Sequence, residues 1–183
     1  MHISQIFRNI PNLITVSRML MTPLAISMIV SQRFLPAFMI FLLAGVSDGV
    51  DGFIARHFDL RSELGAYLDP LADKALLISI YVSLAIYAEL PAWLAIAVVS
   101  RDVMIVVAVM VSWLMHKPVE IRPVWVSKVN TVAQIALAGF ALGARAYGFS
   151  PQPVQTALEW TVAATTIASG GIYIAQWLDH MSR

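Results

Sequence analysis

The sequence contains no cysteine, which excludes disulfide bonds and thiolate metal sites. Any metal ion would therefore be held by oxygen or nitrogen ligands. Charge is also scarce, because only 13% of the 183 residues are Asp, Glu, Lys or Arg, about half of the share that is typical of a globular domain. Together with a hydrophobic content of 59%, this composition indicates a membrane protein.

Basic clusters, repeats and low-complexity tracts are missing as well. A net charge of +1 with dispersed basic residues gives no reason to expect nucleic-acid binding. No cleavable signal peptide is visible, since the start of the chain runs directly into a long apolar segment. We therefore expect one domain over residues 1–183, inserted directly into the cytoplasmic (inner) membrane of a bacterium. A mature organellar protein is the alternative.

Apolar segments long enough to cross a bilayer, which takes roughly 20 residues, follow one another along the chain. Prolines separate several of them, and tryptophans lie near their ends, as interfacial aromatic residues do. The predicted fold class is an all-α integral membrane protein, a bundle of six transmembrane helices. The expected ranges are 12–31, 34–55, 64–88, 91–114, 126–147 and 154–178. Residues 2–9 form either a short interfacial helix or a disordered start.

Lysine and arginine predict the orientation of this bundle, because cytoplasmic loops carry the excess of positive charge. One side of the membrane receives only Arg33 and Arg145. The other side receives Arg8, Arg56, Arg61, Lys117, Arg122 and Arg183. The second side is therefore expected to be cytosolic, with both termini on it.

Charged side chains within apolar helices are the strongest functional signal in the sequence. Each costs several kcal/mol in lipid, so such residues usually face a polar cavity. Salt bridges that only hold helices together are the alternative reading. The charges within or at the ends of the predicted spans are Arg18, Asp48, Asp51, Asp69, Asp73, Lys74, Arg101, Asp102 and Lys128.

Four of these charges are aspartates at helical spacings. Asp48 and Asp51 are three residues apart, and Asp69 and Asp73 are four residues apart, so each pair shares one face of a helix. A short turn between the two helices would let all four carboxylates point at one cavity. Four ionised carboxylates need cations beside them, and oxygen ligands favour Mg²⁺ or Mn²⁺. The pattern predicts a two-metal site that binds phosphate oxygens.

Small residues accompany the aspartates. Gly52 and Ala55 lie on the Asp48 side of their helix, and Gly65 lies one turn before Asp69. The missing side chains would let a nucleotide approach the backbone, and close helix–helix contact is the alternative role. A membrane metal-ion transporter also places acids in its spans, but it does not need such a cradle.

The run from Asp48 to Asp73 resembles the signature D-x2-D-G-x2-A-R-x8-G-x3-D-x3-D of the CDP-alcohol phosphatidyltransferase family at every defined position. This resemblance implies a six-helix membrane bundle, usually a homodimer, whose site opens to the cytosol and releases CMP. It implies that Asp48, Asp51 and Asp69 bind one metal ion, and that Asp48, Asp69 and Asp73 contribute to a second. Asp73 would also be the catalytic base. The residues implied to hold the CDP group are Gly52, Ala55, Arg56 and Gly65.

The expected reaction is a direct in-line attack of an acceptor hydroxyl on the β-phosphorus of CDP-diacylglycerol. Asp73 would take the proton of the hydroxyl, while the metal ions and Arg56 stabilise the departing CMP. A covalent phosphatidyl-enzyme is the alternative, but no nucleophile stands out for it. Lys74 is expected at most to pair with its neighbour Asp73.

The resemblance extends over most of the chain, including the first helix. Asn12, Thr15 and Arg18 recur at intervals of three residues, so they lie roughly on one face and could touch the nucleotide or its phosphates. Helix capping by Asn12 and a snorkelling Arg18 are the alternatives.

Three segments resemble the CMP-forming cardiolipin synthases of this family, which implies phosphatidylglycerol as the acceptor. They are Leu68–Lys74, Ser100–Met104 and Ser127–Gln134. The phosphatidylglycerophosphate synthases are the alternative, but they usually carry Ser-Arg-Glu and Lys-x-Lys-Thr where this chain has Asp102 and Asn130. Their acceptor, glycerol 3-phosphate, carries nearly two negative charges, and Asn130 removes a cation that it would need.

Arg101 and Lys128 remain as ligands for the phosphate of either acceptor. An internal pair with Asp102 is the alternative role of Arg101. The partners expected from the resemblance are CDP-diacylglycerol, phosphatidylglycerol, membrane lipids and a second copy of the chain.

Overall fold

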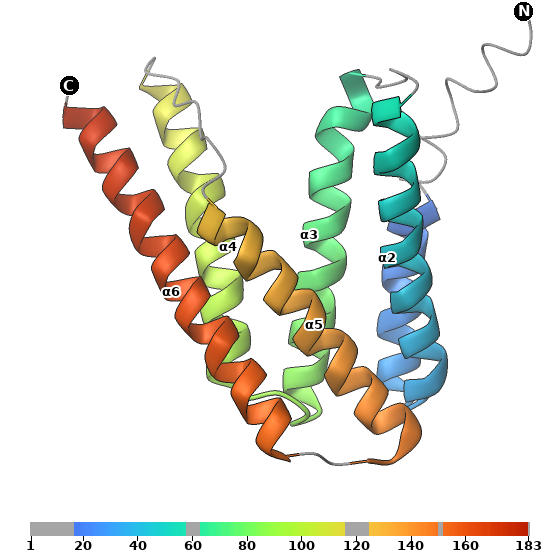
Figure 1. Cartoon of the computed structure of the whole chain (residues 1–183). Coiled ribbons are helices and arrows are strands. Elements are labelled where there is room, and N and C mark those ends of the chain that lie inside the picture. The colour runs from blue at the N-terminus through green and yellow to red at the C-terminus, as the bar shows by residue number, and fades with distance from the viewer. Residues whose placement is uncertain (1–16, 58–62, 116–124, 150–151, 183) are drawn as a thin grey trace, which may run out of the picture. The chain divides into compact units, whose positions relative to one another are not determined.

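The computed structural model describes residues 17–57, 63–115, 125–149 and 152–182, without the side chains of residues 50–57, 63–73, 109, 113 and 182. The described residues form six helices and no strand, which confirms the predicted all-α class (Figure 1). The first helix occupies Ser17–Val30. The others are α2 (Phe34–His57), α3 (Glu63–Ile86), α4 (Ala92–Leu114), α5 (Trp125–Tyr147) and α6 (Gln152–Ser182).

The observed helices lie where the apolar segments predicted them, with one clear difference at the C-terminal end. The last helix continues to Ser182, four residues beyond the predicted end. No glycine or proline follows Gly171 within this helix, so the sequence holds no signal that would end it earlier.

Left-handed residues terminate three of the helices. Gln32 (φ 55°) follows the first helix, Ala88 (φ 57°) follows α3, and Gly148 (φ 70°) follows α5. After the first helix, the Arg33 N–H donates to the carbonyl of Met28 at 2.8 Å. Helices commonly end in this conformation, but it costs a residue other than glycine roughly 1–2 kcal/mol.

The chain divides into two compact units. Unit 1 comprises Met1–Leu84 and Ala141–Ser150, and therefore holds the first helix, α2, nearly all of α3 and the end of α5. Ala37, Phe41 and Ala44 of α2 are buried at helical spacing, and the corresponding stripe of α3 ends in the buried Tyr81 and Leu84. The expectation of one domain over the whole chain stays a prediction.

Unit 2 comprises Ala85–Phe140 and Pro151–Arg183, and therefore holds α4, most of α5 and α6. Within it, α4 packs against α6 (Figure 1). The buried face of α4 begins with Leu94 and Val98 and continues into Arg101 and Asp102, which are also buried. The buried face of α4 is thus aliphatic near the start of the helix and charged further along it.

Among the described residues, one helical segment, Ala92–Ser112 of α4, is long and apolar enough to cross a membrane. Ser17–Val30, Phe34–Gly49 and Lys74–Ile86 are shorter apolar helices. The outer face of α4 is an aliphatic stripe, because Val103, Val106, Val107 and Met110 are all exposed. Six helices are thus confirmed, while the crossing of a bilayer by all six stays a prediction.

Candidate active site

The four aspartates lie on α2 and α3, both in unit 1. Residues 58–62 connect these helices and can span at most about 20 Å, so the end of α2 lies near the start of α3, and Figure 1 shows the two helices side by side. At about 1.5 Å per residue, Asp48 and Asp51 lie about 14 and 9 Å before the end of α2. Asp69 and Asp73 lie about 9 and 15 Å after the start of α3. The two pairs therefore lie at similar distances from these neighbouring helix ends.

The carboxylate of Asp48 has a partner on the first helix. Arg18 Nη1 donates to Asp48 Oδ1 at 2.6 Å, and the exposed fractions of the two side chains are 1% and 47%. A buried guanidinium needs a countercharge, and Asp48 provides it. The pair brings a predicted phosphate ligand and a predicted metal ligand together. A snorkelling Arg18 is excluded, because the guanidinium is buried.

The chemistry of this site fits a hard divalent cation. Asp48 offers oxygen only, and about half of its side-chain surface remains exposed beside Arg18, so a cation can reach the carboxylate. Among the residues whose side chains are described, no group of three His, Asp or Glu could hold a metal ion. The side chains of Asp51, Asp69 and Asp73 lie outside that set, so the four-aspartate metal site stays a prediction.

The predicted CDP ligands divide between described helices and the undescribed start of the chain. Gly52, Ala55 and Arg56 lie on α2, and Gly65 lies in the first turn of α3. Their side-chain surroundings are outside the described residues, as are Asn12 and Thr15. The roles of all six in holding the CDP group stay predictions.

Arg101 is the centre of a buried polar cluster in unit 2. Its side chain is 6% exposed, and Nη1 donates to Asp102 Oδ1 at 2.6 Å. Nη2 donates to Ser127 Oγ at 2.7 Å and to Ser169 Oγ. Cζ lies 5.4 Å from the centroid of the Tyr173 ring. The alternative of an internal pair with Asp102 is thus observed, and the role of Arg101 as an anion ligand stays a prediction.

Asn130 lies in the contact between α5 and α6. It is fully buried, and its Oδ1 accepts hydrogen bonds from Thr165 Oγ1 (2.8 Å) and Thr166 Oγ1 (2.9 Å). Its Nδ2 is a buried donor that has no hydrogen-bond partner among the described residues. The sequence presents Asn130 as the replacement of a lysine, whereas the structure shows that it also joins two helices.

The two predicted lysine sites differ in exposure. Lys128 is exposed, and its Nζ lies 5.7 Å from the centroid of the Trp125 ring, a cation–π geometry. Lys74 is half-buried on α3. The side chain of Asp73 lies outside the described residues, so its pair with Lys74 stays a prediction. Phosphate binding by Lys128 also stays a prediction.

Sequence reasoning missed the contribution of α6. Thr166, Ser169, Tyr173 and Trp177 follow one another at intervals of three or four residues on its inner face, where Trp177 Nε1 donates to Ser112 Oγ of α4 at 2.8 Å. Hydroxyl and aromatic residues at helical spacing in an apolar segment were the available signal, because such residues make hydrogen bonds between membrane helices.

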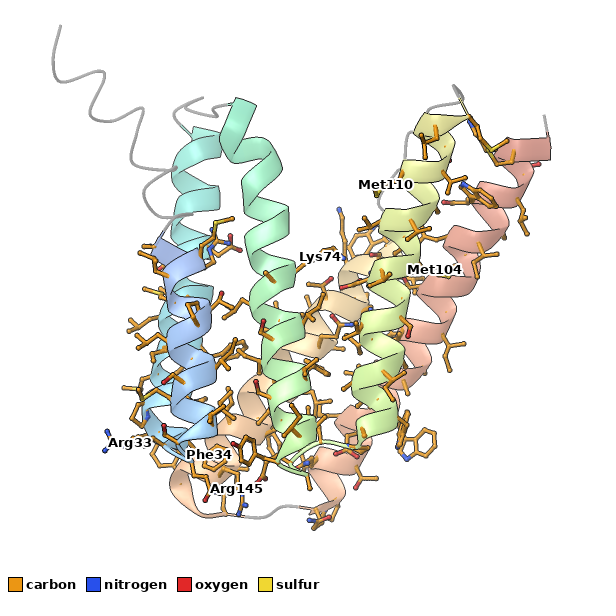
Figure 2. The ribbon with its side chains drawn as sticks, turned by 180° about the vertical axis from the view of Figure 1, so that it is seen from behind. Arg33, Phe34, Lys74, Met104, Met110 and Arg145 are labelled. Carbon is orange, nitrogen blue, oxygen red and sulfur yellow. The ribbon has the colours of Figure 1, made fainter. Side chains whose placement is uncertain are left out.

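The opposite end of unit 1 carries the two arginines that were predicted to lie outside the cytosol. Figure 2 shows Arg33, Phe34 and Arg145 gathered there, and Arg145 Cζ lies 5.6 Å from the centroid of the Phe34 ring. Nearby, the rings of Phe38 and Tyr147 meet edge to face, with centroids 6.0 Å apart. The arginines and the aspartate pairs thus lie toward opposite ends of this unit, while the orientation in a membrane stays a prediction.

A sequence model of the family described as CDP-alcohol phosphatidyltransferase matches residues 8–168 of this chain. The match begins before the first described helix and ends within α6, so it covers both aspartate pairs and Arg101.

Three curated proteins illustrate the similarity. The chain is 37% identical over 181 residues to the cardiolipin synthase (CMP-forming) / mitochondrial hydrolase fusion protein of Schizosaccharomyces pombe, covering 90% of this chain and 30% of that protein. It is 37% identical over 182 residues to the chloroplastic CDP-diacylglycerol–glycerol-3-phosphate 3-phosphatidyltransferase 1 of rice, Oryza sativa subsp. japonica, with coverages of 89% and 55%. It is 36% identical over 181 residues to the cardiolipin synthase (CMP-forming) of Homo sapiens, with coverages of 90% and 60%. The similarity thus spans most of this chain but less than two thirds of each relative.

Proposed function

Because the chain belongs to the CDP-alcohol phosphatidyltransferase family, we propose that it transfers a phosphatidyl group from CDP-diacylglycerol to phosphatidylglycerol, giving cardiolipin and CMP. The observation that carries this proposal is the arrangement in unit 1. Two aspartate pairs lie at similar depths on α2 and α3, and the buried Arg18 contacts the first of the aspartates. Divalent cations and fixed guanidinium donors both stabilise the negative charge of phosphate groups during transfer.

Asp48, Asp51, Asp69 and Asp73 would hold two divalent ions, Mg²⁺ or Mn²⁺. When bound, such ions supply positive charge to the phosphate oxygens of the CDP group. The residues of the chain supply the remaining steps. Asp73 would accept the proton of the acceptor hydroxyl as general base. Arg56 would donate hydrogen bonds to the phosphate oxygens of CMP as their charge develops.

Binding of the CDP group would rest on Arg18 and on the small residues of α2 and α3. Arg18 is held in place by Asp48, so little side-chain freedom is lost when it donates to a phosphate. The residues Gly52, Ala55 and Gly65 have little or no side chain, which would let the nucleotide approach the helices closely. Asn12 and Thr15 would add polar contacts from the start of the chain.

The choice of phosphatidylglycerol as acceptor rests on charge. The positive charge of Arg101 is compensated by Asp102 at 2.6 Å, and Asn130 is neutral. Of the three residues proposed to face the acceptor, Lys128 then supplies a positive charge that no carboxylate of this group balances. One such charge suits a phosphodiester with one negative charge better than a phosphomonoester with nearly two. The yeast and human relatives are named as CMP-forming cardiolipin synthases, which supports cardiolipin as the product.

The alternative acceptor is glycerol 3-phosphate, the substrate named for the rice relative at the same 37% identity as the yeast protein. An acceptor panel tests the choice. Purified protein receives CDP-diacylglycerol and each alcohol in turn, and products are identified by mass. We expect cardiolipin to form faster than phosphatidylglycerophosphate, and the reverse order would overturn the assignment of the acceptor.

The alternative from another functional class is a membrane metal-ion transporter. The same assay separates it from the enzyme, because a transporter would not release CMP when CDP-diacylglycerol is added. CMP release above the rate without protein is the expected result.

We also propose that the enzyme is a multi-pass protein of the bacterial cytoplasmic membrane, works as a homodimer and opens its active site to the cytosol. Its family, the apolar segment of α4 and the distribution of basic residues support this placement. Labelling of introduced cysteines from either side of the membrane would test the orientation, since the sequence has no cysteine of its own.

A further inference from the structure

The guanidinium of Arg101 is held from three helices of unit 2. Asp102 on α4 accepts from Nη1, while Ser127 on α5 and Ser169 on α6 both accept from Nη2. The face of the Tyr173 ring lies one helical turn further along α6, with its centroid 5.4 Å from Cζ. Arginine is a long side chain with many rotamers, so these contacts select one orientation of its planar group.

The α6 backbone passes close to the stem of Arg101 at Gly170. A Cβ atom added to Gly170 would lie 3.6 Å from Cγ of Arg101 and 3.5 Å from the end of Met104. These are ordinary van der Waals distances, so α6 already lies at the surface of the arginine stem. From this position Ser169 accepts a hydrogen bond from the guanidinium, and the Tyr173 ring lies beside it.

One nitrogen of this buried group has no acceptor in the described part of the chain. Arg101 Nε has no hydrogen-bond partner there, although the side chain is only 6% exposed. Buried donors nearly always have a hydrogen-bond partner, and a buried donor without one costs free energy. An oxygen from a bound molecule would satisfy Nε, and an anionic oxygen suits a guanidinium best.

We propose that Ser169 and Tyr173 are positioning residues that fix Arg101 so that its Nε–H meets a phosphate oxygen of the acceptor lipid. This inference rests on the proposed function, because it takes phosphatidylglycerol as the acceptor. Both residues lie beyond residue 168, where the family match ends, so the match itself assigns them no role. Ser127 holds the guanidinium from the α5 side in the same way.

The test uses three serine-to-alanine variants of the full chain. Ser169→Ala and Ser127→Ala each remove one acceptor of Nη2, whereas Ser112→Ala is the matched control. Ser112 is also a buried serine that joins α4 to α6, but its hydrogen bonds go to the Ala108 carbonyl and to Trp177 instead of Arg101. For each variant the measurements are KM for phosphatidylglycerol, KM for CDP-diacylglycerol, kcat and the thermal midpoint in detergent.

We expect Ser169→Ala and Ser127→Ala each to raise KM for phosphatidylglycerol about fivefold, which is the effect of losing one hydrogen bond. KM for CDP-diacylglycerol should stay unchanged. Ser112→Ala should lower the thermal midpoint and leave both KM values as they are. A merely structural role of Ser169 predicts instead that Ser169→Ala behaves like Ser112→Ala, and that result would overturn the inference.

Tyr173 gives a second, independent measurement. Tyr173→Phe keeps the ring face and should leave KM for phosphatidylglycerol unchanged, whereas Tyr173→Leu removes it and should raise this KM severalfold. Equal values for the two variants would contradict the role of the ring.

Binding of phosphatidylglycerol is also measured directly, by the thermal shift that it causes in the absence of CDP-diacylglycerol. A wild type that releases no CMP would overturn the proposed function, and the lipid-induced shift would still decide the inference. Equal shifts in wild type, Ser127→Ala and Ser169→Ala would overturn it.

Discussion

Replacing Arg18 by glutamine tests the contact on which the candidate site rests. The side chain of Arg18 is 1% exposed, and Nη1 lies 2.6 Å from Asp48 Oδ1. Glutamine keeps a hydrogen-bonding head but removes the positive charge. We expect the variant to be less stable and to bind CDP-diacylglycerol less tightly. It should need less Mg²⁺ for activity, because no cation then competes for Asp48.

The size of the stability change follows from the two exposures. A hydrogen bond to a charged group contributes about 1.5–3 kcal/mol when it is buried. Since Asp48 is about half exposed, solvent screens the pair, and we reduce the expected loss to about 1–2 kcal/mol. For a chain of 150–250 residues, each kcal/mol corresponds to a shift of about 2–4 °C in the thermal midpoint. The expected decrease is therefore roughly 2–8 °C.

The assay compares wild type, Arg18→Gln and the control Arg33→Gln in the same detergent. Arg33 is an exposed arginine in unit 1, so its replacement removes one charge without breaking a buried pair. Thermal midpoint, KM for CDP-diacylglycerol and the Mg²⁺ concentration at half-maximal rate are recorded. The reasoning is refuted if Arg18→Gln matches Arg33→Gln in both midpoint and KM.

Three further predictions concern the metal ions, the base and the contact between α5 and α6. EDTA should abolish CMP release, and Mg²⁺ or Mn²⁺ should restore it; full turnover in metal-free buffer would contradict the four-aspartate site. Asp73→Asn should bind CDP-diacylglycerol normally but lose most of kcat, because the base is gone; near-normal activity would assign the base to another group. Asn130→Lys should raise the use of glycerol 3-phosphate relative to phosphatidylglycerol, measured as the ratio of kcat/KM values. An unchanged ratio of kcat/KM values would contradict the role of Asn130 in acceptor choice. The same change should lower the thermal midpoint, because it removes the buried amide that accepts hydrogen bonds from Thr165 and Thr166, at a cost of about 1–3 kcal/mol.

The helices could be predicted from the sequence because each apolar segment is long and bounded by proline, glycine or charge. The prediction of 91–114 agrees closely with α4, Ala92–Leu114. The end of α6 could not be predicted in this way, because polar residues such as Asp179 and His180 remain helical when no residue breaks the helix. Hydropathy records where apolar character ends, whereas a helix ends where the backbone loses its hydrogen bonds.

The candidate site was predictable only as far as local spacing reaches. The aspartate pairs could be placed on two helix faces because residues three or four apart are neighbours on a helix. The pairing of Arg18 with Asp48 spans thirty positions, and the contact of Arg101 with Ser169 spans sixty-eight. No local pattern encodes such distances, so the sequence could show that these charges need partners but not which partners they have.

The outward aliphatic stripe of α4 has a consequence for how the protein assembles. In the bilayer proposed as its surroundings, Val103, Val106 and Val107 are as well solvated by lipid tails as by another helix, so covering them gains little free energy. Helix association then depends on close packing and on hydrogen bonds between inward-facing groups, such as Trp177 with Ser112. The helices can therefore insert into the bilayer separately before they pack against one another. The polar groups of α6 would then determine which helices it packs against, because contact with lipid tails does not favour one apolar helix over another.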